Sequence, residues 1–116
     1  MQRKFRLTRS EDFKRVRRSG KSYAHPLVVL IVQAHDQPRV KVGVAAGRTV
    51  GTAVYRNRAK RLLREAMRPL IPDITPGLDL ILIARPGLTS ASLEEARRAL
   101  LNLLQRAQIL IPLNES

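Results

Sequence analysis

The sequence has 116 residues, which is enough for one domain with a hydrophobic core and too few for two. It contains no cysteine, which excludes a disulfide framework and a thiolate metal site, and its longest apolar run is strand-sized, so neither a signal peptide nor a membrane span is predicted. Lysine and arginine number 22 against 9 acids, and the resulting net charge of +13 predicts a polyanion as partner, because an external counter-charge relieves the repulsion within the fold.

The positive charge is unevenly distributed along the chain. Residues 1–68 contain 18 Lys or Arg against 4 acids, whereas residues 69–116 contain 4 against 5. Arginine outnumbers lysine 17 to 5, which favours planar, bidentate contact with phosphate. The binding surface is therefore expected on the elements that residues 1–68 form.

The first predicted element is a short basic helix. It begins at a capping box formed by Thr8 and Glu11, and it ends at Gly20. Phe13 and Val16 are its apolar anchors, and Phe13 is either a core residue or part of a binding surface. The rest of the helix is mostly basic, with Lys14, Arg15, Arg17 and Arg18.

Two strands are predicted next. Residues 27–32 are an unbroken apolar run, which is typical of a strand covered on both faces or nearly so. Residues 39–44 alternate between apolar and polar, which predicts a second strand antiparallel to the first. Its inward positions are Val40, Val42 and Val44, and its basic outward positions are Arg39 and Lys41.

A glycine-containing loop, residues 47–51, leads into the central helix, with Thr49 or Thr52 as the cap. The loop lacks the Gly-Lys-Ser/Thr ending of a Walker loop. A helix entry with free N–H groups can still hold one phosphate, and the alternative is a tight strand-to-helix turn.

Residues 56–68 are predicted to form an amphipathic helix with a row of cations on one face. Like charges four residues apart destabilise a helix by roughly a few tenths of a kcal/mol per pair, so a bound polyanion explains this row better than folding does. One alternative is a solvated helix surface, but such a surface usually carries both positive and negative charges, and Glu65 is the one acid among residues 56–68. The other alternative is a helix that lies on a membrane surface. The row contains Asn57, Lys60, Arg61, Arg64 and Arg68, and the predicted core face contains Tyr55, Ala59, Leu62, Leu63 and Ala66.

The remaining elements are a strand and a nearly neutral helix. Pro69 ends the central helix, residues 78–84 are predicted to be a third strand, and Ser92 with Glu95 forms a second capping box. The last helix is expected to cover the sheet through Ala96, Leu100, Leu103 and Leu104. The predicted order is helix, strand, strand, helix, strand, helix, in an α+β, two-layer sandwich that forms one polyanion-binding domain, residues 1–116.

The sequence pattern offers no candidate catalytic residues and no metal ligands. A protein nuclease needs clustered carboxylates for metal ions, or a histidine pair or triad that moves protons. The acids here are scattered, and His25 and His35 are the only histidines. A protein-only nuclease is therefore disfavoured, and the residues indicate an arginine-rich binding module.

The run from residue 44 to residue 68 resembles the signature of the bacterial ribonuclease P protein family. Arg56-Asn57-Arg58, Lys60-Arg61 and Arg64-Glu65 have the spacing of that family, and the likeness extends to residues 7–20 and, more loosely, to the final helix. The resemblance implies a cytoplasmic protein that binds the catalytic RNA of ribonuclease P and the 5′ leader of precursor tRNA. It also implies that the RNA carries out the chemistry with magnesium held mainly by RNA, and that the fold contains a left-handed β-α-β crossover, against the usual rule.

The resemblance also implies two groups of RNA-contacting residues. The catalytic RNA would contact Arg48, Arg56, Asn57, Arg58, Lys60, Arg61, Arg64 and Arg68, and the leader cleft between the first helix and the sheet would contain Phe13, Arg17 and Ile31. Relatives often carry aromatic residues at the positions of Arg17 and Ile31. A ribosomal or other structural RNA-binding protein is the alternative, because it would have the same charge.

Overall fold

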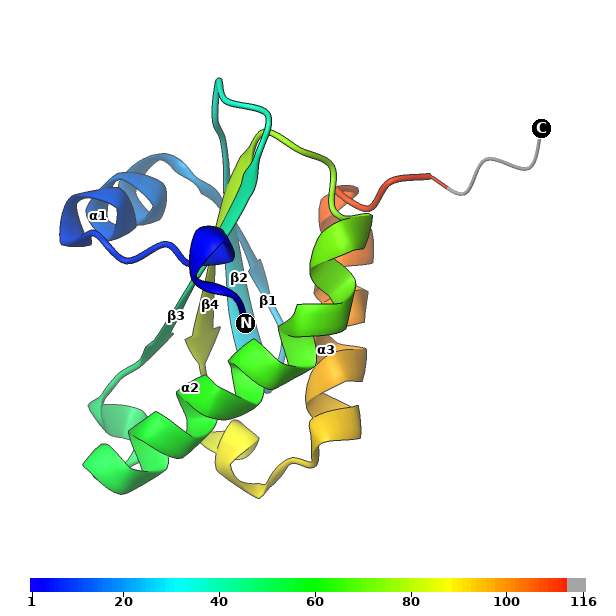
Figure 1. Ribbon diagram of the computed structural model, residues 1–116. Helices are drawn as coiled ribbons and strands as arrows, with labels where there is room; N and C mark the ends of the chain where they lie inside the picture. The colour runs from blue at the N-terminus through cyan, green and yellow to red at the C-terminus, as the bar shows by residue number, and fades with distance from the viewer. Residues whose placement is uncertain (113–116) are drawn as a thin grey trace.

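A four-stranded mixed sheet with the order β1-β2-β4-β3 forms the centre of the protein (Figure 1). The computed structural model describes residues 1–112, so the last four residues of the predicted domain lie outside it. The strands are Lys21–Ala24 (β1), Val28–Ala34 (β2), Val40–Ala46 (β3) and Leu78–Ala84 (β4), and the helices are Ser10–Ser19 (α1), Ala53–Met67 (α2) and Leu93–Ala107 (α3). Short 3₁₀ helices lie at Arg3–Phe5, Arg48–Val50, Arg68–Asp73 and Pro86–Ser90.

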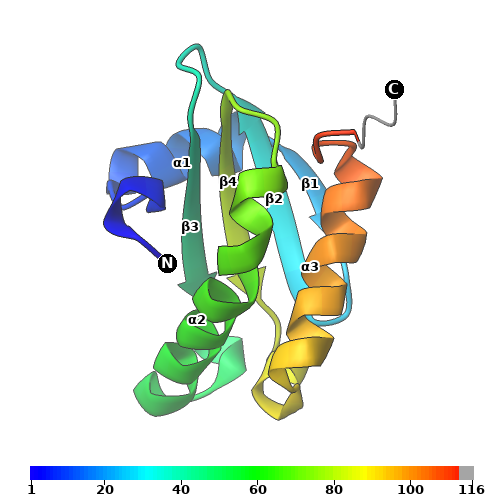
Figure 2. The same ribbon diagram turned by 45° about the vertical axis from the view of Figure 1, so that its right-hand side comes forward.

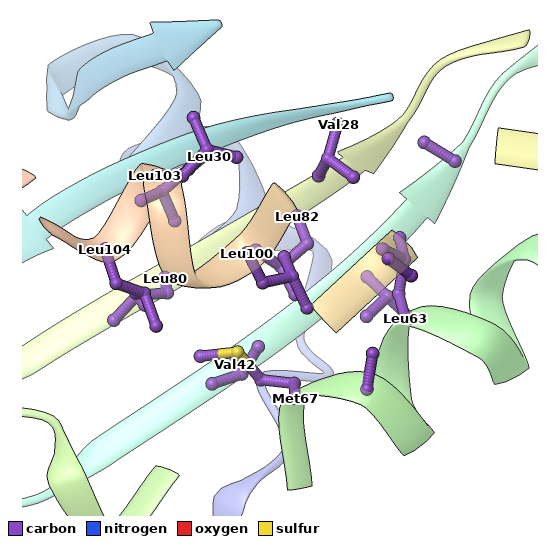
Figure 3. Close-up of a cluster of buried hydrophobic side chains, with 14 of the residues drawn as sticks. Val28, Leu30, Val42, Leu63, Met67, Leu80, Leu82, Leu100, Leu103 and Leu104 are labelled. Carbon is purple, nitrogen blue, oxygen red and sulfur yellow. The ribbon is translucent and has the colours of Figure 1, made fainter. Parts of the chain in front are cut away.

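Helices cover both faces of the sheet. α2 and α3 pack on one face, and α1 lies on the other (Figure 2). The larger core lies under α2 and α3 and includes Leu30, Val42, Leu63, Met67, Leu80, Leu82, Leu100 and Leu103 (Figure 3). The smaller core lies under α1 and consists of Leu7, Val16, Ile31 and Ile81. The predicted α+β sandwich is confirmed, and α1 adds a third, smaller layer to the two that were expected.

The sheet contains one strand more than predicted, and its strand order is different. β2 pairs antiparallel with β1 and with β4, whereas β3 pairs parallel with β4. The strand predicted at residues 39–44 is β3, and it runs antiparallel to β2 as expected, but β4 lies between them. β4 takes the central place because Leu80, Ile81 and Leu82 are all fully buried, as they must be in a strand covered on both faces. β1 was missed because it is short and mostly exposed, so its sequence lacks a clear apolar alternation.

The connection from β3 through α2 to β4 is a left-handed crossover, as the resemblance implied. Both strands run downward in Figure 2, α2 lies in front of them, and β4 is to the right of β3. A right-handed crossover would place β4 on the other side of β3. Among residues 1–112, no helix combines the length and the apolar character that a membrane crossing needs.

α2 ends at Met67, where the 3₁₀ helix containing Pro69 begins. Ala59, Leu63 and Ala66 are buried, which confirms the core of the predicted apolar face. The prediction for Tyr55 is wrong, because this side chain is 47 % exposed. Tyr55 belongs to the first turn of α2, and this end of the helix extends past the end of the sheet (Figure 1).

One of the two predicted capping boxes is present. At α3, the Glu95 backbone N–H donates to the Ser92 hydroxyl at 3.0 Å, and the Ser92 backbone N–H donates to the Glu95 carboxylate at 2.9 Å. At α1, the N-cap residue is Arg9, without a side-chain capping bond, so the box predicted for Thr8 and Glu11 is wrong. The helix begins one residue later than that spacing requires.

Candidate nucleic-acid interface

The solvent-facing side of α2 and the turn before it are strongly basic. We call this side the α2 basic surface, and it consists of Arg48, Arg56, Asn57, Arg58, Lys60, Arg61, Arg64 and Arg68. Arg56, Lys60 and Arg64 are half-buried, and the other members are exposed. Within residues 1–112, the cations of this surface form one ion pair, between Arg68 and Glu65 at 2.7 Å. The remaining cations are available to an external anion.

A hollow of about 440 Å³ lies along this surface, lined by Val54, Asn57, Lys60, Arg61 and Arg64. Three of the five lining side chains are cations, and no acid contributes to the lining. Successive turns of one helix place these groups, so their spacing is fixed by the backbone. A phosphate in the hollow would therefore meet several positive groups that are already in position.

Arg6 brings the N-terminal segment beside this hollow. The Leu7 backbone N–H donates to the Val42 carbonyl at 2.9 Å, which holds the segment along the edge of β3. Burial, and then the charge of Arg6, lower the pKa of Arg64, so the two cations lie close enough to repel each other. They line a second cavity of about 230 Å³ together with Phe13.

Two arginines in this region have unused donors. The Nε atoms of Arg6 and Arg56 are buried without a hydrogen-bond partner in residues 1–112. A buried donor left without a partner costs roughly 1–3 kcal/mol, which an acceptor such as a phosphate oxygen would offset. Sequence patterns missed Arg6, because it precedes the first helix and belongs to no periodic segment.

The three predicted leader-cleft residues occupy different environments. Phe13 is half-buried, and its ring lies so close to Gly43 that a Cβ at that position would overlap it. Arg17 is exposed one helical turn further along the same edge of α1. Ile31 is only 7 % exposed and belongs to the small core beneath α1, so it offers little surface to a ligand.

The sheet beside α1 contains residues that sequence patterns did not assign to a site. Val29 and Ile83 are opposite each other in the β2–β4 pairing, one row beyond Ile31 and Ile81, and they are half-buried. The two-residue alternation puts them on the same face as Ile31. The helix edge that carries Phe13 and Arg17 therefore borders an apolar strip of sheet.

A buried carboxylate also fixes α1 to the sheet. It lies one row beyond Ile31 and Ile81, on the side away from Val29 and Ile83. Asp79 on β4 is fully buried and accepts hydrogen bonds from Arg15 on α1, at 2.6 Å, and from Arg39. Arg15 also contacts Asp12, at 3.3 Å, and Gln33. Burial alone would raise the pKa of Asp79, but the hydrogen bonds and charges of the two guanidinium groups outweigh it and hold this pKa below its usual range. Arg15 and Arg39 were expected on free basic faces, and that expectation is wrong.

The two histidines each belong to a turn, and His35 lies beside the Asp36 carboxylate, with its Nδ1 atom at 3.2 Å. The Nδ1 atom of His25 accepts a hydrogen bond from the Leu27 backbone N–H, and that of His35 accepts one from the Gln37 N–H, both at 3.0 Å, so each histidine stabilises its own turn. No three His, Asp or Glu side chains of residues 1–112 come together in a way that could hold a metal ion.

The sequence matches proteins of one family over nearly its full length. The family model for ribonuclease P matches residues 1–108. The ribonuclease P protein component of Herpetosiphon aurantiacus is 45 % identical over 109 residues, which are 94 % of this chain and 89 % of that protein. The ribonuclease P protein component of Brevibacillus brevis is 39 % identical over 111 residues, covering 95 % of this chain and 88 % of the other.

Solved structures share the fold. The ribonuclease P protein of Staphylococcus aureus superposes with a TM-score of 0.81 at 25 % identity, covering 91 % of this chain and 97 % of that one. The ribonuclease P protein of Thermotoga maritima superposes with a TM-score of 0.77 at 30 % identity, covering 87 % of this chain and 96 % of that one.

Proposed function

Because this chain belongs to the ribonuclease P protein family, we propose that it binds the catalytic RNA of ribonuclease P and the 5′ leader of precursor tRNA, and assists removal of that leader in the cytoplasm. The α2 basic surface is the observation that carries the proposal. Residues 56–68 contain six cations, five on α2 and Arg68 directly after it, and one of the six is paired with an acid. Such a surface is suited to a phosphate backbone, because guanidinium groups bind phosphate through planar, paired hydrogen bonds.

The proposal assigns the bond-breaking chemistry to the RNA. Magnesium prefers carboxylate, phosphate and water oxygens, and residues 1–112 contain no cluster of carboxylates that fits such an ion. The magnesium ions of the assembled enzyme would therefore be held mainly by RNA. In this proposal the chain binds the catalytic RNA through the α2 basic surface, and it binds and positions the leader through the edge of α1 that borders the sheet.

A reconstitution assay tests this proposal. The protein is incubated with precursor tRNA and magnesium, with and without the catalytic RNA encoded by the same genome. Cleavage at the mature 5′ end that requires both components supports the proposal. Cleavage by the protein alone selects a protein nuclease, and RNA binding without any effect on cleavage selects a structural RNA-binding protein.

Leader binding is expected to depend on Phe13 and Arg17. Phe13→Ala and Arg17→Ala should each weaken binding of precursor tRNA to the assembled enzyme by roughly 5-fold or more, because base stacking contributes about 1–3 kcal/mol per base and guanidinium groups both stack and bind phosphate. Binding of mature tRNA should not change. The measurement is the ratio of the two dissociation constants, together with its salt dependence.

Arg18→Ala is the matched control for this prediction. Arg18 is exposed on the same helix, and its position turns it away from the edge that carries Phe13 and Arg17. The thermal unfolding of each variant is measured as well, since Phe13 packs on Gly43. An unchanged affinity ratio in folded Phe13→Ala and Arg17→Ala proteins would show that this edge does not bind the leader.

A further inference from the structure

An exposed aromatic side chain stands at the N-terminal end of the α2 basic surface. Tyr55 is 47 % exposed, and its neighbour Val54 is 67 % exposed. Single exposed apolar side chains are common on protein surfaces. This pair is different in one respect, because it borders the α2 basic surface, whose members are all cations except Asn57, and Val54 lines the hollow on that surface. The apolar area is therefore continuous with the proposed phosphate contacts.

The backbone before α2 supports the Tyr55 ring. Gly51 has φ of +133°, a conformation that favours glycine, and a Cβ at this position would lie 3.2 Å from the Cβ of Tyr55 and 3.3 Å from its Cδ2. The absence of that Cβ lets the ring lie against the turn. The turn thus supports one side of the ring, although this end of α2 extends past the end of the sheet.

Arg58 is placed to act together with this ring. Its guanidinium carbon is 6.0 Å from the Tyr55 ring centroid, at the outer limit of a cation–π contact. The contact is therefore weak enough to be exchanged for another partner. A nucleobase can stack on the ring while the guanidinium group binds the adjoining phosphate.

We propose that Tyr55 is a stacking platform for one unpaired nucleobase of the catalytic RNA, with Arg58 binding the neighbouring phosphate. This inference rests on the proposed function and adds a base contact to a surface otherwise made of phosphate contacts. The base must be unpaired, because bases inside a duplex already have both faces stacked. The source is the catalytic RNA rather than the leader, because α2 and the α1 edge lie on opposite faces of the sheet (Figure 2).

The test uses a single tryptophan as the reporter. The sequence has no tryptophan and two tyrosines, so Tyr55→Trp and Tyr23→Trp each create one emitter, and Tyr23 is half-buried on β1, away from α2. Titration with the catalytic RNA of the same genome should quench the fluorescence of Tyr55→Trp and leave that of Tyr23→Trp nearly unchanged. Precursor tRNA alone should quench neither.

The affinity of substituted proteins supplies the second measurement. Tyr55→Ala should weaken binding to the catalytic RNA about tenfold, the size of one base-stacking contact, and Tyr55→Phe should keep the affinity. The slope of log affinity against log salt should stay the same in Tyr55→Ala, whereas Arg58→Ala should reduce it by about one. This difference separates stacking from charge, and circular dichroism checks that α2 is retained.

Three results would overturn the inference. The first is an unquenched Tyr55→Trp protein that still binds the catalytic RNA. The second is quenching by precursor tRNA alone, and the third is a Tyr55→Ala affinity equal to that of the unmodified protein. If the unmodified protein does not bind the catalytic RNA at all, the proposed function itself has failed, so the two failures are distinguishable.

Discussion

Replacing Asp79 by Asn is expected to lower the free energy of unfolding by about 3 kcal/mol. The carboxylate is fully buried between Arg15 and Arg39. Its neutralisation removes the counter-charge that the two guanidinium groups share and leaves Arg15 with its longer ion-pair contact to Asp12, at 3.3 Å. Loss of one partner from a buried ion pair costs about 3–5 kcal/mol. We take the lower value because the Arg15 and Arg39 side chains are 32 % and 26 % exposed, so water reaches them. Urea denaturation provides the measurement.

The same carboxylate makes stability depend on pH. The pKa of Asp79 is lower in the folded protein than in the unfolded chain, so the unfolded chain binds more protons as the solution is acidified. The ionised Asp79 carboxylate makes its full contribution to the free energy of unfolding above the ordinary carboxyl pKa of about 4. This contribution is lost as the pH falls through the folded-state pKa. The Asp79→Asn protein should therefore lose less stability than the unmodified protein below about pH 4.

Glu94→Gln is the control for both measurements. Glu94 pairs with Arg98 across one turn of α3, and both side chains are largely exposed. An exposed pair of this kind contributes roughly 0.3–0.5 kcal/mol. If Asp79→Asn and Glu94→Gln had equally small effects, the network around Asp79 would not be what holds α1 on the sheet.

Removing three exposed cations of the α2 basic surface together is expected to abolish most of the affinity for the catalytic RNA. In the triple variant Arg48→Ala, Arg58→Ala, Arg61→Ala, the slope of log affinity against log salt should fall by about 2.7, since each lost phosphate contact contributes about 0.9. At about 0.1 M salt this loss corresponds to a decrease in affinity on the order of 500-fold. The measurement is a binding titration at several salt concentrations.

A second triple variant carries the same change in net charge elsewhere. Lys21, Arg85 and Arg98 are exposed and belong to β1, the loop after β4 and α3, respectively. Their replacement by Ala should leave the slope almost unchanged if the phosphates contact α2. Equal slopes in the two triple variants would mean that the RNA responds to net charge alone, and α2 would then have no special place in the interface.

Periodic segments were the part of the fold that the sequence predicted well. β4 matches the predicted strand at residues 78–84, and the Ser92 capping box opens α3 as expected, because apolar spacing and caps are local properties. The left-handed crossover was predicted from the family resemblance and not from the periodicity of the sequence. The strand order could not be predicted, because every strand that is apolar on both faces is a candidate for the centre of the sheet.

The errors at the candidate site have a common physical origin. Arg15 is 64 residues and Arg39 is 40 residues from Asp79, so their neutralisation depends on contacts that no local pattern records. Tyr55 occupies a core position on the helical wheel, yet the sheet ends before it. Helical periodicity gives the direction of a side chain, but it does not tell how far the neighbouring layer extends.

The position of β4 in the sheet has a consequence for folding during synthesis. β2 and β3 have no direct pairing with each other, and both are joined through β4. A nascent chain that has not yet reached residue 78 therefore has strands but cannot assemble this sheet. By then 18 of the 22 cations have been made. During translation, most of the positive charge is thus present on a chain that cannot yet fold, in the presence of ribosomal and messenger RNA.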